Sequence, residues 1–287
     1  MKKKDNARES NFKRRIVSTV LLVLSAAAVI ILPVSFRSGF ERDPFEDFFS
    51  SKTEPTVGII TVWHIVSFKP YVGSLGIWLN QRAKDFVSSY NNLYFEVKSF
   101  SPEDAKAELE RGITPDIISF AYGTLQADDL LSNENLSALA YPYCASGQVI
   151  IFDPNKTDSQ SEEEIIGSAG SEQEYKAGKA ISCVTDIRGA GDLTRAQLVG
   201  KCPYFEIKAL GGMDELVQYI GLFRSIAPEK IPYAAAFIDY LTDKKAQETL
   251  SSIGLIPVSN EANANYEQQW LNDLYSIIKG SGFPPPL

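Results

Sequence analysis

Histidine is almost absent from this chain of 287 residues: the one example is His64, in the stretch ITVWHIVSF. Cysteine is scarce too, because Cys144, Cys183 and Cys202 stand far apart in the sequence. Zinc sites recruit several histidines or cysteines, and a Ser-His or Cys-His site needs an oriented histidine beside its nucleophile. No G-x-S-x-G elbow is present. We therefore expect no metal site, no catalytic residues, no cofactor and no enzymatic activity.

The odd number of cysteines allows at most one internal disulfide and leaves one thiol over. Cys183 and Cys202 are the favoured pair. The alternative is that all three are small buried hydrophobic residues that never pair.

Charge is missing from the whole segment Ile16–Phe36, whose 21 residues could cross a hydrocarbon layer of roughly 30 Å as a helix. Seven Lys and Arg residues lie in segment 1–15, which favours a cytoplasmic N-terminus and an external remainder. The alternative is a cleaved signal peptide, for which Ala26–Ala28 offer small residues, although an apolar run continues after them. We favour a single-pass anchor in the cell membrane.

Basic residues are few beyond this anchor. Segment 1–37 holds eight of the 28 Lys and Arg residues and two of the 36 Asp and Glu residues, so the remainder has 20 basic and 34 acidic residues, a net charge of −14. Such a surface repels nucleic acid, and we expect no nucleic-acid partner.

The first part of the remaining chain alternates between strand and helix patterns. Segment 37–55 is an irregular linker, and the β-branched run Val57–Trp63 predicts a strand covered on both faces. A helical stripe follows over Leu75–Tyr90, then an alternating strand at Leu93–Phe100. Ser101 and Pro102 are typical of a helix start, and a third strand follows Pro115. This order predicts an α/β fold with a parallel sheet.

The second part is less regular. We expect a strand at Gln148–Phe152, a solvated loop over 153–171, a helix that starts with a Ser171/Glu174 capping box, and then a strand ISCVTDI. Periodicity predicts one long helix over Pro232–Ile253 and a last one over Ala262–Lys279. Trp78 lies inside a helical pattern and is expected in the core.

The stretch RGAGDLT, from Arg188 to Thr194, resembles part of a dinucleotide-binding glycine loop. Thr194 replaces the third glycine, and Asp192 would repel a pyrophosphate. Two alternatives stay open: a glycine-rich turn into a helix, or a turn whose N–H groups and Arg188 donate to a ligand. The acidic pairs Asp128/Asp129 and Glu162–Glu164 could in principle serve a glycosidase, but such runs are usually solvated.

Three stretches together resemble the extracellular solute-binding proteins of ABC importers, including the oligosaccharide-binding members. They are ITVWH with the helix and strand after it, AELERGITPDIISFAYG, and AAAFIDYLTDKKAQETLSSIGLIPVS. The last is the most specific, since it is similar to a late helix of the family's first lobe and the extended segment that follows. Here the second lobe is short, and a membrane span replaces the lipid-anchoring cysteine of Gram-positive relatives.

This resemblance implies a two-lobe periplasmic-binding-protein-like fold with a hinge, after one N-terminal transmembrane helix. The first lobe would comprise 56–142 and 209–287, and the second lobe 143–208. The expected partners are a small polar ligand, a carbohydrate being favoured, and the permease subunits of an ABC importer. The alternative is a degenerate accessory or sensor domain that contacts another envelope protein.

In open α/β sheets, ligands bind beyond the carboxyl ends of the strands. The residues expected there, or near the crossover between the lobes, form the candidate ligand site. They are Trp63, His64, Ser119, Tyr122, Tyr141, Tyr143, Arg188 and Asp192.

Overall fold

A computed structural model describes residues 58–90, 92–122, 124, 136, 139–283 and 285–287, without the side chains of 213–215. All of these residues belong to one compact unit that ends at Leu287. Within the described part of the chain, no helix is long and apolar enough to cross a membrane. The expected anchor Ile16–Phe36, the linker 37–55 and the pair Asp128/Asp129 lie outside the described residues.

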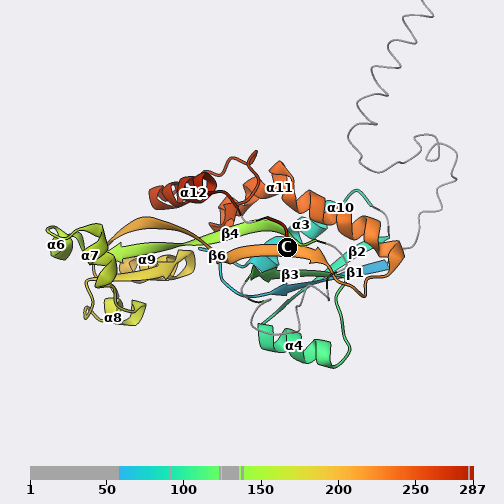
Figure 1. Ribbon diagram of the computed structural model, residues 1–287, viewed down its shortest axis with the longest axis horizontal. Coiled ribbons are helices and arrows are strands. Elements are labelled where there is room, and N and C mark those ends of the chain that lie inside the picture. The colour runs from blue at the N-terminus through green and yellow to red at the C-terminus, as the bar shows by residue number, and fades with distance from the viewer. Residues whose placement is uncertain (1–57, 91, 123, 125–135, 137–138, 284) are drawn as a thin grey trace, which may run out of the picture. The chain divides into compact units, whose positions relative to one another are not determined.

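Parallel strands β1 (Gly58–Ile65), β2 (Leu93–Phe100) and β3 (Ile117–Ala121) form one end of the sheet, with β1 in the middle. We call this half of the fold the first lobe (Figure 1). Ile60, Val62 and Ile65 of β1 have no exposed surface. The β-branched run therefore forms the buried central strand that the sequence predicts, because both faces of a parallel sheet are covered.

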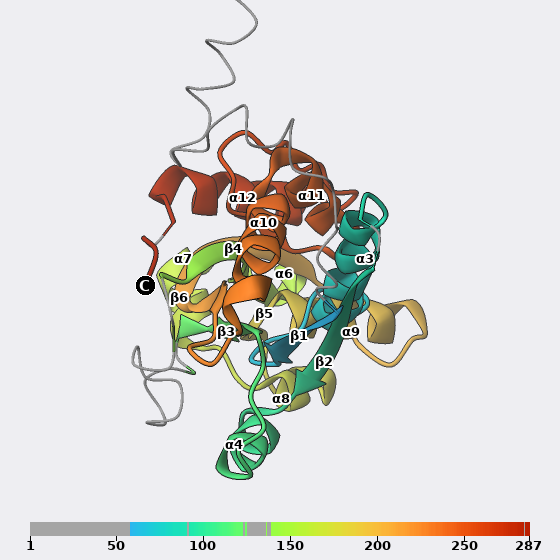
Figure 2. The ribbon, with the colours of Figure 1, turned by 90° about the vertical axis from the view of Figure 1, so that its right-hand side faces the viewer.

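Helix α3 (Leu75–Val87) covers one face of this sheet, and α4 (Pro102–Glu110) lies on the other (Figure 2). The expected helix over Leu75–Tyr90 is confirmed, although it ends three residues earlier. In α4 the predicted cap is confirmed: the hydroxyl of Ser101 accepts a hydrogen bond from the backbone N–H of Asp104 at 3.1 Å.

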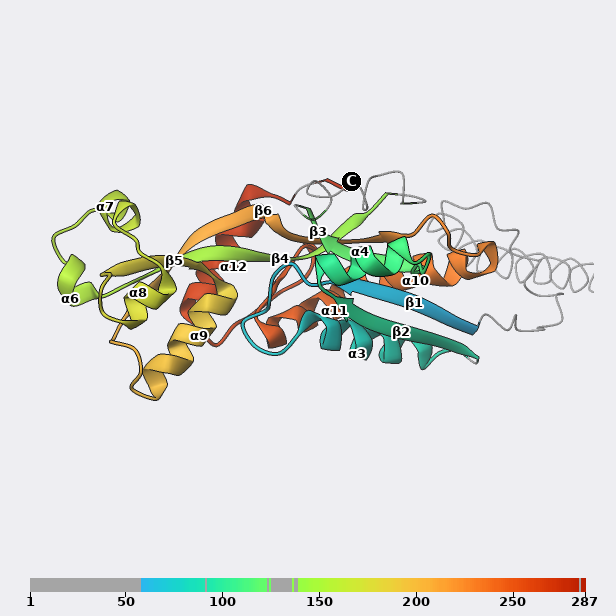
Figure 3. The ribbon, with the colours of Figure 1, turned by 90° about the horizontal axis from the view of Figure 1, so that it is seen from below.

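Two long antiparallel strands, β4 (Tyr141–Phe152) and β6 (Glu206–Leu222), run from one lobe into the other (Figure 3). The strand expected at Gln148–Phe152 thus begins at Tyr141. Pro142 and Gly147 disfavour a regular strand, but shifts in register between β4 and β6 beside both residues accommodate them. The parallel arrangement is confirmed for β1 to β3, whereas β3, β6, β4 and β5 pair in an antiparallel manner.

The second lobe is small and packs short helices around the outer halves of β4 and β6. Its elements are α6 (Pro154–Thr157), α7 (Glu162–Gly167), α8 (Glu172–Lys176), β5 (Ser182–Asp186) and α9 (Ile187–Leu198). The expected capping box of Ser171 and Glu174 is confirmed at α8. The solvated loop predicted over 153–171 is wrong in part, because Ser161 and Glu164 form a second capping box that starts α7.

After β6 the chain returns to the first lobe and ends in a helix over the crossing strands. The elements are η3 (Pro228–Lys230), α10 (Ile231–Thr242), α11 (Lys244–Glu248), η4 (Thr249–Ile253), β7 (Ile256–Pro257) and α12 (Gln269–Ser281). The single helix expected over Pro232–Ile253 is wrong, because extended backbone at Asp243 ends α10 and its carboxylate caps α11. The last helix begins at Gln269 rather than Ala262.

Glycines mark the place where β4 and β6 pass between the lobes. Gly147 lies opposite Gly212, and a Cβ on Gly147 would lie 2.7 Å from the carbonyl oxygen of Gly211 and 2.8 Å from Leu274 of α12. The side chain of Ile278 lies beside the same glycines. The absence of side chains on the strands therefore allows α12 to pack directly on their backbones.

Cys144, Cys183 and Cys202 are all described, and each is a free, buried thiol. The expected pairing of Cys183 with Cys202 is therefore wrong for this structure, and the alternative of small buried hydrophobic residues holds. Cys183 and Cys202 lie in one apolar core with Tyr175 and Ile187.

Candidate functional site

Four of the eight expected site residues have buried side chains. Trp63 is 2% exposed and packs against Phe100, with ring centroids 4.7 Å apart. His64, Ser119 and Tyr143 are equally covered. Their side chains are inaccessible to solvent in this structure. Their contact with a ligand stays a prediction.

His64, Ser119 and Tyr143 form a buried polar network with Gln218, which joins the four adjacent strands β1, β3, β4 and β6. The Ser119 hydroxyl lies 2.9 Å from the Tyr143 hydroxyl and 3.3 Å from Nδ1 of His64. Nε2 of Gln218 donates to the Ser119 hydroxyl at 3.0 Å. Because buried polar groups need hydrogen-bond partners, this network holds the inner ends of the crossing strands to the first lobe.

Burial lowers the pKa of His64 from its usual 6.5 to about 4. The imidazole is therefore neutral at physiological pH, with one nitrogen that can donate a hydrogen bond and one that can accept. No carboxylate is among its hydrogen-bond partners in the described part of the chain. This arrangement differs from a catalytic histidine, which an acid usually orients.

Tyr122 and Tyr141 retain accessible surface. Tyr122 follows β3 and is partly buried, with its ring centroid 6.4 Å from that of Tyr219. Tyr141 begins β4 and is 43% exposed. Both can offer part of an aromatic face to a ligand.

Arg188 and Asp192 lie on one side of α9 and pair with each other at 3.3 Å. Asp192 also pairs with Arg195. Burial alone would raise the pKa of Asp192, but the hydrogen bond from Arg195 and the charge of Arg188 outweigh it and lower the pKa. The two expected site residues thus form a partly exposed ionic cluster on the second lobe.

The stretch RGAGDLT lies wholly inside helix α9, so the expected glycine-rich turn before a helix is wrong, and the glycines have a packing role within the helix. A Cβ on Gly189 would overlap Thr185 and Glu172, which hydrogen-bond to each other. A Cβ on Gly191 would lie 2.9 Å from Cδ2 of Tyr71. Glycine is therefore required at Gly191 for the loop after β1 to approach the second lobe.

Tyr71 is the side chain that sequence reasoning missed, and it joins three parts of the fold. Besides Gly191, it contacts Gly254 after η4, where a Cβ would overlap its own Cβ. Its ring also meets the Trp270 ring of α12 edge-on, with centroids 5.7 Å apart. Its position in the loop after β1, beyond the carboxyl end of a parallel strand, is a signal that could have identified it.

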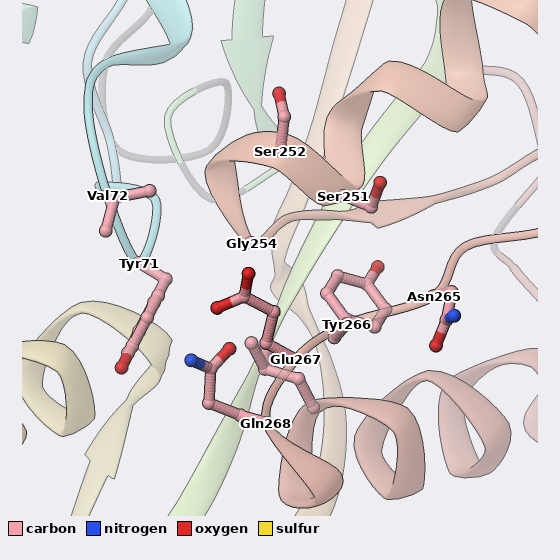
Figure 4. A pocket seen from close by; sticks show the side chains of 10 residues that line it. Tyr71, Val72, Ser251, Ser252, Gly254, Asn265, Tyr266, Glu267 and Gln268 are labelled. Carbon is pink, nitrogen blue, oxygen red and sulfur yellow. The ribbon is translucent and has the colours of Figure 1, made fainter.

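A cavity of about 410 Å³ lies beside Tyr71, and we call it the Tyr71 pocket (Figure 4). Its volume falls within the usual range of small-molecule sites. It is bounded by the loop after β1, the turn after η4 and the segment that leads into α12. The lining residues are Tyr71, Val72, Ser251, Ser252, Gly254, Asn265, Tyr266, Glu267, Gln268 and Leu271.

Tyr266 forms the buried wall of the pocket. Its hydroxyl donates to the carbonyl oxygen of Leu255 at 2.7 Å, and burial raises its pKa well above the ordinary value. Its backbone N–H and C=O both bond to the side chain of Asn272. These bonds fix the segment before α12, which explains why residues 262–268 are ordered without being helical.

Comparison with known proteins shows likeness in structure only. No family model matches the sequence, and no curated protein does. A maltodextrin-binding protein from L. casei BL23, solved without ligand, superimposes with a TM-score of 0.53 at 11% identity, over 79% of this chain and 88% of that one. Ferric iron-binding protein A of Mannheimia haemolytica, in an open conformation, gives 0.51 at 11% identity, over 78% and 96%.

Both relatives are solute-binding proteins, one for a sugar polymer and one for a metal ion. The chain therefore has the two-lobe fold of periplasmic binding proteins. This agrees with the fold implied by the resemblance in sequence.

Proposed function

We propose that this chain is an extracytoplasmic solute-binding protein that captures a small polar ligand, a carbohydrate, for an ABC importer. The observation that carries the proposal is the position of Tyr71, which extends from the first lobe to α9 of the second lobe beside the Tyr71 pocket. Two lobes joined by paired strands can close over a ligand by bending at the crossing.

The proposal includes the cellular arrangement. Segment 1–15 lies in the cytoplasm, Ile16–Phe36 anchors the chain in the membrane, and 37–55 links it to the external lobes. The lobe boundaries 56–142, 143–208 and 209–287 belong to the same proposal. Permease subunits receive the ligand, and the acidic surface keeps nucleic acid away.

Ligand contacts come from the Tyr71 pocket and from expected site residues with accessible surface: Tyr122, Tyr141, Arg188 and Asp192. Aromatic rings stack on the apolar faces of sugar rings, while amides, hydroxyls and ionic groups bond to their hydroxyls. Trp63, His64, Ser119 and Tyr143 remain part of the proposed site, although their side chains are buried in this structure.

Trp270 provides the experiment, since it touches Tyr71 and is one of three tryptophans in the chain. The full chain, purified in detergent, is titrated with a panel of sugars, amino acids and metal ions while tryptophan fluorescence and thermal unfolding are recorded. We expect at least one sugar to raise the unfolding temperature and to change the fluorescence. In Trp270→Phe the thermal shift should persist while the fluorescence response is lost.

Tyr71→Ala should weaken binding of the sugar that responds. Tyr94→Ala is the matched control, because Tyr94 is an exposed tyrosine of β2 that does not line the pocket. Absence of any thermal shift across the panel at millimolar concentrations would contradict the proposal. Co-purification with envelope or signalling proteins instead of permease subunits would contradict the transport role.

A further inference from the structure

We infer that the Tyr71 pocket selects ligands that carry a protonated amine together with hydroxyl groups, as amino sugars do. This inference rests on the proposed function, because it specifies the ligand class for the same pocket. It follows from the charge, the hydrogen-bonding character and the aromatic surface of the lining residues.

The first observation is an unbalanced negative charge. Glu267 is the one carboxylate among the lining residues, and the lining contains no lysine or arginine. Figure 4 shows the carboxylate of Glu267 and the carboxamide of Gln268 directed into the space between Tyr71 and Tyr266. In the described part of the chain, no ion pair or hydrogen bond engages the Glu267 carboxylate.

Two acids of the second lobe, Asp192 and Glu172, each have a basic neighbour. Asp192 pairs with Arg188 and Arg195, and Glu172 lies 4.0 Å from Lys176. Glu267 differs from these two acids because it lines a cavity that has no basic residue, although its side chain is also exposed to solvent. A cation entering the pocket would gain a Coulomb interaction that an anion would lose.

The second observation is that hydroxyl protons in the lining are already engaged. Ser251 donates to the carbonyl oxygen of Glu248 at 2.8 Å, and Ser252 donates to that of Thr249 at 2.7 Å. Tyr266 donates to the carbonyl oxygen of Leu255. A hydroxyl whose proton is used retains its lone pairs, so the two serines offer acceptors to a ligand.

The lining offers acceptors at the Glu267 carboxylate, the two serine oxygens and the amide oxygens of Asn265 and Gln268, while the NH2 groups of the same two amides are donors. The acceptors that no lining donor satisfies are the carboxylate and the serine oxygens. A ligand that satisfies them must supply donors. An ammonium group has three N–H donors and no acceptor, and hydroxyl groups add one donor each. A carboxylate or phosphate ligand would supply only acceptors and would leave lining groups unpaired.

The third observation is the aromatic surface. The Tyr71 ring lines the pocket and also contacts Trp270 and Gly191. An ammonium group over a tyrosine face is attracted by the ring quadrupole. A carboxylate opposite an aromatic face, with acceptors between them, favours a primary amine attached to a hydroxylated ring.

Glucose, glucosamine and glucuronate test the inference, because they share one ring and differ in charge. Binding to the full chain in detergent is measured by calorimetry at about pH 6, where the amine is protonated. We expect glucosamine to bind roughly tenfold more tightly than glucose, since hydrogen bonds between charged groups are about twice as strong as neutral ones. Glucuronate should bind most weakly, and N-acetylglucosamine should resemble glucose.

Glu267→Gln should remove the preference, so that glucosamine binds no more tightly than glucose. Glu261→Gln is the matched control, because Glu261 is an exposed acid in the same segment that does not line the pocket. Equal binding of glucose and glucosamine, a preference that persists in Glu267→Gln, or binding of only neutral or anionic panel members would overturn this inference. Those outcomes would leave the proposed solute binding intact. If no compound of the panel binds, the proposed function itself is contradicted.

Discussion

The aromatic ring of Tyr71 lies directly against the backbone of Gly191, so that the first lobe touches helix α9 of the second lobe. A Cβ on Gly191 would lie 2.9 Å from Cδ2 and 3.0 Å from the carbonyl oxygen of Tyr71. The side chain of Arg195 donates to the same carbonyl at 3.4 Å. One loop residue therefore sets how closely the two lobes approach beside the pocket.

Gly191→Ala should disturb this contact, because the new methyl group has no space unless Tyr71 moves. We expect the free energy of unfolding to fall by about 1–3 kcal/mol, the usual cost of overpacking. Chemical denaturation measures this change, and Trp270 fluorescence reports displacement of Tyr71. Gly280→Ala is the control, because it is also a helical glycine with open space around it, and it should stabilise the chain by about 1 kcal/mol. Equal effects of the two substitutions would contradict the contact.

Gly147→Ala should act at the crossing of β4 and β6. Its Cβ would lie 2.7 Å from the carbonyl oxygen of Gly211 and 2.8 Å from Cδ1 of Leu274. We expect a loss of about 1–3 kcal/mol in the free energy of unfolding. The loss should shrink when Leu274→Ala is also present, since that change removes one of the two clashes. Purely additive effects in the double-mutant cycle would argue that α12 does not pack on Gly147.

Gln247→Leu should be among the most destabilising polar substitutions. Its buried amide donates to the carbonyl oxygens of Tyr143 and Leu241 at 2.7 Å each, and accepts from the N–H groups of Val258 and Ser259. Removal leaves these backbone groups unpaired, so we expect a loss of about 2–4 kcal/mol. Gln269→Leu, at an exposed position, should change the unfolding free energy by less than about 0.5 kcal/mol. A similar small effect at Gln247 would refute the role assigned to it.

His64 should make stability depend on pH in a defined window. Because its folded pKa is lowered from 6.5 to about 4, a falling pH protonates the unfolded chain first and favours unfolding. Stability is unaffected above pH 6.5 and falls progressively between pH 6.5 and 4, and the loss reaches about 2 kcal/mol at pH 5. No other histidine exists in the chain. Comparison with His64→Gln isolates the effect, since the variant should lose less stability between pH 7 and 5; parallel curves would exclude it.

The three thiols should react only after the chain unfolds. All three are buried and free, and burial raises the pKa of Cys183 to about 12, which suppresses the reactive thiolate. Without reductant, a thiol reagent should label the native chain slowly and should label three thiols in denaturant. If only one thiol reacts in denaturant, the prediction is wrong and the pairing of Cys183 with Cys202 is supported instead.

Local signals in the sequence were sufficient for several elements in both lobes. The β-branched run of β1, the Ser101 cap of α4 and the Ser171/Glu174 box of α8 depend on neighbours within a few residues, so they could be recognised without the fold. The core position of Trp78, whose indole N–H donates to Thr249 at 2.9 Å, also followed from helical periodicity.

Other features depended on partners far along the chain. Periodicity favoured one helix through Asp243, but the side chain of Asp243 caps a new helix there, and the bonds of Tyr266 to Asn272 hold the segment before α12 out of a helix. The Gly-x-Gly of α9 suggested a phosphate loop, whereas Gly191 makes room for a tyrosine from 120 residues earlier.

The sequence by itself determined the α/β class, the order of most strands and helices, and the strongly acidic character, because these follow from composition and short-range periodicity. The two lobes were implied only by the resemblance to solute-binding proteins. The tertiary structure alone decided which of the expected site residues are buried and which are exposed. His64, Ser119 and Tyr143 became buried because four strands converge on them, and the Tyr71 pocket formed where three segments distant in sequence meet. Burial depends on such long-range packing, which no local pattern encodes.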